Sequence, residues 1–140
     1  MILNVLKSAC ISFLVLSLIA CSNPLKPLGK TGELSRDDFM NAMRWKQFTI
    51  AASHIVPEHS QDFLKTFTAL KDIHIVDVRL INLQTISEGR QFETAIEMDY
   101  YLLPSVTLKT FSYNLTWVYF DGDDPARQGF LINTPFPDFP

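Results

Sequence analysis

The sequence has few cysteines and no concentration of basic residues. Its 140 residues include two cysteines, Cys10 and Cys21, and 12 lysine and arginine residues that form no basic run. A nucleic-acid-binding surface needs clustered lysine and arginine to meet the phosphates, so that class of partner is excluded. The sequence also lacks the glycine-rich phosphate loop and the serine-centred elbow of many hydrolases. It therefore carries no enzyme signature.

The first 20 residues contain a short hydrophobic segment. Lys7 precedes an apolar run from Cys10 to Ala20, which is interrupted by Ser12 and Ser17. A helix needs about 20 apolar residues to cross the roughly 30 Å hydrocarbon core of a bilayer. This run is too short, and a charged start followed by a short apolar stretch is typical of a secretory signal peptide.

The run ends in Leu18, Ile19, Ala20 and Cys21, which resembles the lipobox of bacterial lipoproteins. The resemblance implies that a diacylglyceryl group is attached to the Cys21 thiol and that the chain is cut before Cys21, usually with a further acyl chain added. We therefore predict that residues 1–20 are a lipoprotein signal peptide and that Cys21 is the lipid attachment site. An ordinary signal peptide with a chance cysteine and a buried amino-terminal helix are the alternatives.

Ser22 follows the predicted attachment site. A serine here resembles outer-membrane lipoproteins, whereas an aspartate would indicate retention at the inner membrane. We therefore expect a lipid-anchored protein of the bacterial cell envelope, on the periplasmic face of the outer membrane, because two or more acyl chains bind a membrane stably. Cys10 is lost with the signal peptide, so the mature chain would have no disulfide.

The expected mature chain is acidic and rich in aromatic residues. It has 120 residues, and the loss of one lysine leaves 11 basic against 15 acidic residues, a net charge of −4. This length fits one domain with a hydrophobic core of its own. Its ten phenylalanines, four tyrosines and two tryptophans predict that rings line either the core or a cavity.

The chain divides into a tether and one domain. Residues 21–34 are predicted to be the lipidated cysteine and a flexible tether, because prolines and glycines recur there. Ser35 begins a capping pattern, and Pro57 suits the first position of a further helix. Apolar residues recur at helical spacing after both. A break near Trp45 would give three helices rather than two.

The second half of residues 35–140 alternates in the manner of strands. We predict strands over residues 73–83, 92–102, 106–120 and 130–133, with bulges in the first. Helices followed by consecutive antiparallel strands indicate an α+β domain, with two or three amino-terminal helices packed on a curved four-stranded antiparallel sheet.

This order of elements is similar to the cone-like nuclear transport factor two-like (cystatin-like) fold. More narrowly, residues 35–140 resemble a group of small uncharacterised proteobacterial lipoproteins. The motifs that carry this resemblance are Arg44–Trp45, Val56–His59, Met98–Tyr101 and Pro135–Pro137. It implies no known chemistry, and the acid or base pair of enzymes with this fold has no matching residues here.

Histidines and carboxylates are the candidate groups for metal binding or acid–base chemistry. His54 and His59 are five residues apart, which is not the four-residue spacing that brings two imidazoles to one metal on a helix. Glu93, Glu97 and Asp99 alternate on one strand face, which is typical of a solvated surface. We expect no metal site, no cofactor and no catalytic residue.

Five residues were assigned to a candidate pocket or patch: Arg44, Trp45, Tyr100, Tyr113 and Trp117. Aromatic rings that are buried can be explained by core packing. More rings than a small core needs would indicate a cavity or a protein-binding patch. We predict a non-enzymatic binding or interaction module that meets an envelope protein or forms a homodimer. The alternative is a small-molecule-binding or weakly catalytic domain with a cavity inside the cone.

Overall fold

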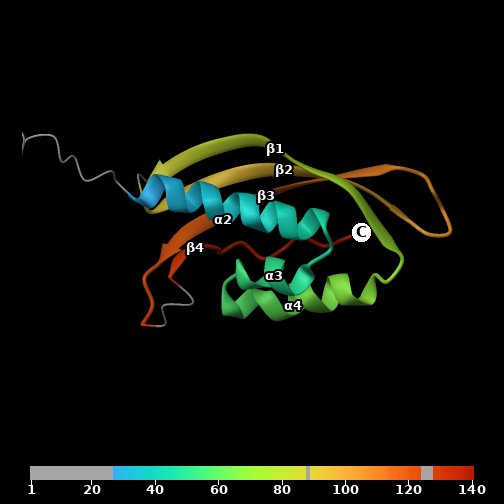
Figure 1. Cartoon of the computed structure of the whole chain (residues 1–140), viewed down its shortest axis with the longest axis horizontal. Coiled ribbons are helices and arrows are strands. Elements are labelled where there is room, and N and C mark those ends of the chain that lie inside the picture. Colours follow the sequence, from blue (N-terminus) through green and yellow to red (C-terminus); the bar gives the residue numbers. More distant parts are fainter. Residues whose placement is uncertain (1–26, 88, 124–127) are drawn as a thin grey trace, which may run out of the picture.

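The computed structural model describes residues 27–87, 89–123 and 128–140, with side chains from Thr31 onward. Three helices pack against one face of a four-stranded antiparallel sheet of strand order β1-β2-β3-β4, which confirms the predicted α+β class (Figure 1). The predicted signal peptide and Cys21 lie outside the described residues. The elements are α2 (Pro27–Arg44), α3 (Phe48–Ser53), α4 (Pro57–Ala69), β1 (Ile73–Ser87), β2 (Gln91–Leu102), β3 (Lys109–Phe120) and β4 (Gly129–Ile132).

The first helix begins at Pro27, so the prediction of a flexible tether is wrong for residues 27–34. Proline is well suited to the first position of a helix, which has no partner for an N–H group. A side-chain carbon at Gly32 would lie 2.9 Å from the ring of Phe92, so the glycine permits close packing of helix on sheet. This tertiary contact outweighs the low helix propensity of the glycines.

The helical region breaks after Arg44, as the three-helix alternative predicted. Lys46 adopts a positive φ of 55°, and the Gln47 N–H donates to the Ala42 carbonyl at 2.8 Å. A residue with this conformation ends a helix because it turns the chain out of the helical path. The chain then forms α3, and Pro57 opens α4 as predicted.

The second strand has the predicted two-faced character. Its buried residues are Phe92, Thr94, Ile96, Met98 and Tyr100, and their neighbours on the other face are more exposed. The third strand begins at Lys109 and not at residue 106, so the β2–β3 connection is longer than expected. This connection extends beyond the helices at the end of the domain opposite the start of α2 (Figure 1).

The first strand contains three register shifts against β2, which fulfil the expectation of bulges. They lie between Ile75 and Asp77, between Leu80 and Asn82, and between Thr85 and Ser87. Each bulge adds one residue to one strand and increases the local twist. The repeated bulges account for the bend of the sheet around α2.

The carboxyl-terminal segment after β4 fills the space between α4 and the sheet. The Phe136 ring lies 5.2 Å from the Phe63 ring and 5.0 Å from the Tyr113 ring, measured between centroids. The Phe139 ring lies 5.3 Å from Phe67 and 4.8 Å from Tyr100. This segment thus contributes to the core, although its prolines predicted only an end to strand pairing.

Candidate functional site

Three of the five predicted site residues lie together in the core. Tyr100, Tyr113 and Trp117 are buried on the sheet face that the helices cover. Trp117 packs edge-on against Phe39 and stacks on Phe92, and its Nε1–H donates to the Thr94 hydroxyl at 3.0 Å. These rings pack against other side chains of the core.

The Tyr113 hydroxyl is buried and has no hydrogen-bond partner among the described residues. Burial raises the pKa of this phenol, because the phenolate would be desolvated. A buried polar group without a partner has lost its hydrogen bonds to water and received none in return.

Replacing Tyr113 with phenylalanine should therefore leave the free energy of unfolding unchanged or raise it by up to about 1 kcal/mol. Chemical denaturation of the two purified proteins measures this difference, with the half-buried Tyr101→Phe as a matched control. A clear loss of stability in Tyr113→Phe would show that the hydroxyl has a partner after all.

Two carboxylates of the opposite sheet face, Glu97 and Asp99, are held by an arginine that was not predicted as a site residue. Arg79 on β1 forms ion pairs with Glu97 at 2.8 Å and with Asp99. Its guanidinium lowers the pKa of Asp99, and a hydrogen bond from the Thr110 hydroxyl adds to the effect. An ionised, paired carboxylate of lowered pKa is poorly suited to act as a general acid or base near neutral pH.

The three histidines lie apart. His54 follows α3, His59 lies on α4, and His74 stacks on Tyr101 at a centroid distance of 4.8 Å. Within residues 27–87, 89–123 and 128–140, no three His, Cys, Asp or Glu side chains group as metal ligands. Burial lowers the pKa of His54 below its ordinary value of 6.5, and nearby Asp38 partly opposes the shift.

His54 should make the domain less stable in mild acid. Its pKa is lower in the folded protein, so the unfolded chain takes up the proton first as the pH falls below the ordinary value of 6.5. The free energy of unfolding should therefore fall between about pH 7 and about pH 5, and fall less in His54→Gln. Urea denaturation at both pH values measures this; equal losses in both proteins would contradict it.

The other two predicted residues lie at the surface, at the end of α2. Trp45 is 72% exposed, and Arg44 contacts β1, where its guanidinium donates to Asp77 at 3.4 Å and to the Val78 carbonyl. Arg44 thus joins the helix to the edge of the sheet. The structure does not bring these two residues together with Tyr100, Tyr113 and Trp117, which are buried.

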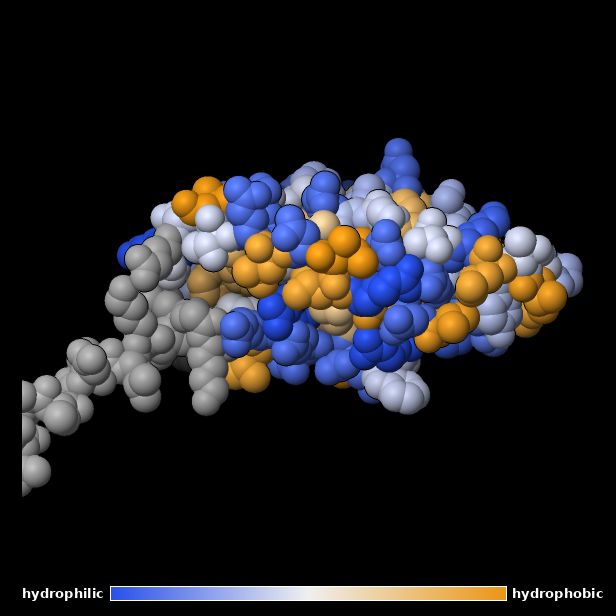
Figure 2. All heavy atoms as spheres, turned by 90° about the horizontal axis from the view of Figure 1, so that it is seen from above, coloured by the Kyte–Doolittle hydropathy of each residue, from blue (hydrophilic) through white to orange (hydrophobic). Residues whose placement is uncertain are grey.

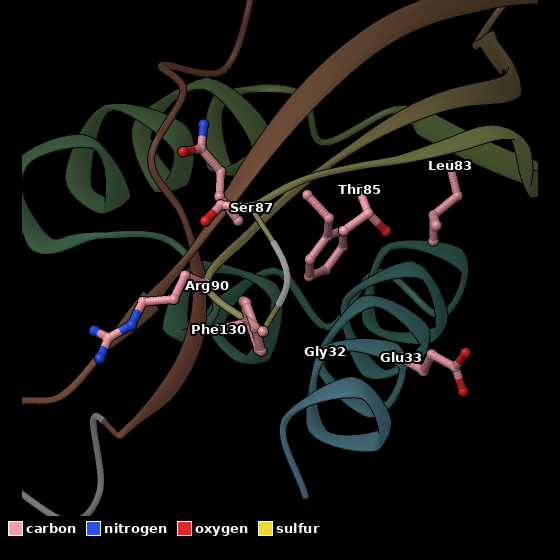
Figure 3. A pocket seen from close by; sticks show the side chains of 10 residues that line it. Gly32, Glu33, Leu83, Thr85, Ser87, Arg90 and Phe130 are labelled. Atoms are coloured by element: carbon pink, nitrogen blue, oxygen red, sulfur yellow. The ribbon is translucent and has the colours of Figure 1, made fainter. Parts of the chain in front are cut away.

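A shallow apolar groove of about 200 Å³ lies at the start of α2 (Figure 3). Its lining includes Leu83 and Thr85 of β1, Gly32 and Glu33 of α2, and Phe130 of β4. The groove is open to solvent and is lined mostly by apolar atoms. It is small for a drug-sized ligand, since such pockets are usually about 300–1,000 Å³.

Exposed aliphatic side chains gather in two places. Five are on β1, and Figure 2, which looks onto the β1 side of the domain, shows apolar side chains over this strand: Val76, Leu80, Ile81, Leu83 and Ile86. A second group of three, Leu103, Val106 and Leu108, is in the β2–β3 connection, and Val106 is 77% exposed. We call residues 103–108 the hairpin tip. Neither group was predicted from the sequence.

The fold places the domain among α+β proteins in which helices cover one face of a bent antiparallel sheet. Two similar solved structures are a SEC-C motif containing protein from Psychrobacter arcticus and a "putative polyketide cyclase" from Xanthomonas campestris. The identities are 10% and 9%, and the TM-scores 0.52 and 0.51. The matches cover 71% and 74% of this chain, and 56% and 88% of the two structures.

These likenesses concern the fold alone. The second supports, at the level of the fold, the predicted nuclear transport factor two-like arrangement. No family model and no curated protein sequence matches the chain. In the part of the chain that the structure describes, none of the helices has the length and apolar character to span a membrane.

Proposed function

We propose that this chain is a lipid-anchored protein of the bacterial envelope whose domain is a non-enzymatic interaction module. The sequence Leu18 to Cys21 supports lipid attachment at Cys21, and Ser22 supports the periplasmic face of the outer membrane. The narrower relationship to small proteobacterial lipoproteins is part of this proposal. The partner is an envelope protein.

The hairpin tip carries the proposal of an interaction. Leu103, Val106 and Leu108 are exposed aliphatic residues in one short connection, and clustered exposed apolar side chains mark sites of protein contact. The tip lies at the opposite end of the domain from Pro27, where the chain enters α2 (Figure 1). The six residues from Cys21 to Pro27 span at most about 20 Å, so the attachment point stays near α2 and leaves the tip free.

The packing of the interior favours this function over the small-molecule alternative. Phe136 and Phe139 fill the space between α4 and the sheet, where an open cavity was considered. On the outer face, Glu97 and Asp99 are paired with Arg79, which makes them poor candidates for a general acid or base. A hollow of about 510 Å³ remains between α4 and residues 135–140, but polar atoms make up most of its lining, unlike the ring-lined cavity of the alternative.

A photoreactive amino acid at Val106 tests the proposal in living cells. Illumination should attach one envelope protein to the chain, because the side chain is 77% exposed at the tip. Ile50 on α3 is an exposed aliphatic control, and the same probe there should capture nothing reproducible. Adding Leu108→Asp should abolish the Val106 product without changing the amount of the protein. Identical products from both positions, or none from Val106, would count against the proposal.

A further inference from the structure

A separate hollow, which we call the lysine hollow, lies at the end of the domain that carries the hairpin tip. Its volume is about 350 Å³, and its lining comes from the start of α3, the end of α4 and the start of β1. The Leu103 N–H of the hairpin tip donates to the Asp72 carbonyl at 3.1 Å. Lys71 and Ile73, on either side of Asp72, line the lysine hollow. In Figure 1, the end of α4, the start of β1 and the β2–β3 connection share one end of the domain.

The lysine hollow combines a buried apolar part with an exposed polar part. Its apolar side chains, apart from Ile73, are Phe48, Leu64, Phe67 and Leu70, all half-buried or buried. The Phe48 and Phe67 rings stack at a centroid distance of 4.8 Å. Its exposed side chains are two lysines and two threonines: Lys46, Thr49, Thr68 and Lys71. None of the described residues that line it is an aspartate or a glutamate.

The two lysines have no carboxylate close enough to neutralise them. Among the side chains that the structure describes, ion pairs are formed only by three arginines: Arg36, Arg44 and Arg79. The Lys46 ammonium instead donates to the Ile73 carbonyl at 3.3 Å. The chain as a whole has a net charge of −3, so this basic hollow runs against the overall charge. A positive surface of this kind is complementary to an anionic partner.

Lys46 also has a backbone conformation that lysine rarely adopts. Its φ is 55°, in the left-handed region where glycine and asparagine are common. Glycine would adopt this conformation at lower cost. A strained residue with a long charged side chain, placed at the edge of a hollow, therefore indicates a role for that side chain.

We propose that the lysine hollow binds an acidic segment of the protein that contacts the hairpin tip. A carboxylate of this segment lies beside Lys46 and Lys71, and an apolar side chain packs on Phe48 and Leu70. This inference rests on the proposed contact at the tip and states the chemistry of the partner. A hollow that opens to solvent buries little of a small molecule, whereas a protein segment is also held by the neighbouring contact at the tip. The charges then add specificity and speed of association.

A photoreactive amino acid at Thr68 of the full chain tests the proposal in living cells. Illumination should attach the same protein that the probe at Val106 captures. Mass spectrometry of the product should identify a crosslinked peptide that contains aspartate or glutamate. Gln61, which is exposed on α4 outside the lysine hollow, is the control and should capture nothing reproducible. A crosslinked peptide without an acidic residue, or a different protein at Thr68, would overturn the proposal.

The two positions separate this inference from the contact at the tip. A product from Val106 without one from Thr68 would overturn the lysine hollow and leave the tip contact standing, and no product from either position would count against both. Lys46→Glu combined with Lys71→Glu should abolish the Thr68 product. Lys65→Glu makes the same change of charge on α4 outside the lysine hollow and should leave the product unchanged. A Thr68 product that survives the double charge reversal would contradict an acidic partner.

Lys46→Gly separates binding from folding. Thermal unfolding of this variant should stay close to that of the parent, because glycine adopts a positive φ without strain. The amount of the Thr68 product should nevertheless decrease, since one of the two ammonium groups is lost. An undiminished product in Lys46→Gly would contradict the role of this side chain.

Discussion

Replacing Trp117 with alanine should lower the free energy of unfolding by about 3–5 kcal/mol, the usual range for removing a large buried ring. Trp117 is completely buried between Phe39 and Phe92, so the truncation leaves a cavity. It also leaves the Thr94 hydroxyl without the indole N–H that donates to it. The total stability of a small domain is about 5–15 kcal/mol, so this loss is a large fraction of it.

Urea denaturation followed by circular dichroism measures this loss, with Trp45→Ala as the matched control. Trp45 is 72% exposed, and its truncation should change the free energy of unfolding by less than about 0.5 kcal/mol. Trp117→Phe should fall between the two, because it keeps a ring and loses the hydrogen bond. Equal effects at positions 45 and 117 would mean that Trp117 is not in the core.

Replacing Cys21 with serine should abolish lipid labelling and leave the chain at precursor length. The resemblance of Leu18 to Cys21 to a lipobox implies that cleavage follows attachment of lipid to the thiol, which serine lacks. Metabolic labelling with a clickable palmitate analogue, followed by gel electrophoresis, measures both effects. Cys10→Ser is the matched control and should be labelled and cut normally, because Cys10 lies in the segment that is removed.

A Cys21→Ser chain of mature length would contradict the attachment site, as would palmitate label that persists in it. Loss of label in Cys10→Ser but not in Cys21→Ser would show that the lipid is attached to Cys10. Neither outcome would affect the fold, since residues 1–26 lie outside the described part of the chain.

The architecture could be predicted because local patterns agree with it. The alternation from Phe92 to Leu102 fixed which face of β2 is buried, and Pro57 marked the start of α4. The start of α2 was missed because Gly29 and Gly32 suggest a loop. The contact of Gly32 with Phe92, which lies sixty residues away, becomes visible only in the folded structure.

The candidate surfaces were harder to predict than the fold. Tyr100, Tyr113 and Trp117 were identified as ring-bearing strand residues, but sequence periodicity does not distinguish a filled core from a cavity. The outcome depended on Phe136 and Phe139, which occupy the interior although no regular element contains them. The exposure of Val76, Ile81 and Ile86 depends on the positions of the three bulges of β1, which alternation alone does not specify.

The proposal of a lipid-anchored module is tested most directly by fractionating cells that express the native chain or a form without Cys21. The native chain should remain in the membrane pellet through high-salt and alkaline washes, because several acyl chains hold it there. A chain that begins at Ser22, behind an ordinary cleavable secretion signal, should fold and appear in the soluble periplasmic fraction. Native chain in the soluble fraction, or equal membrane retention of both forms, would contradict the account.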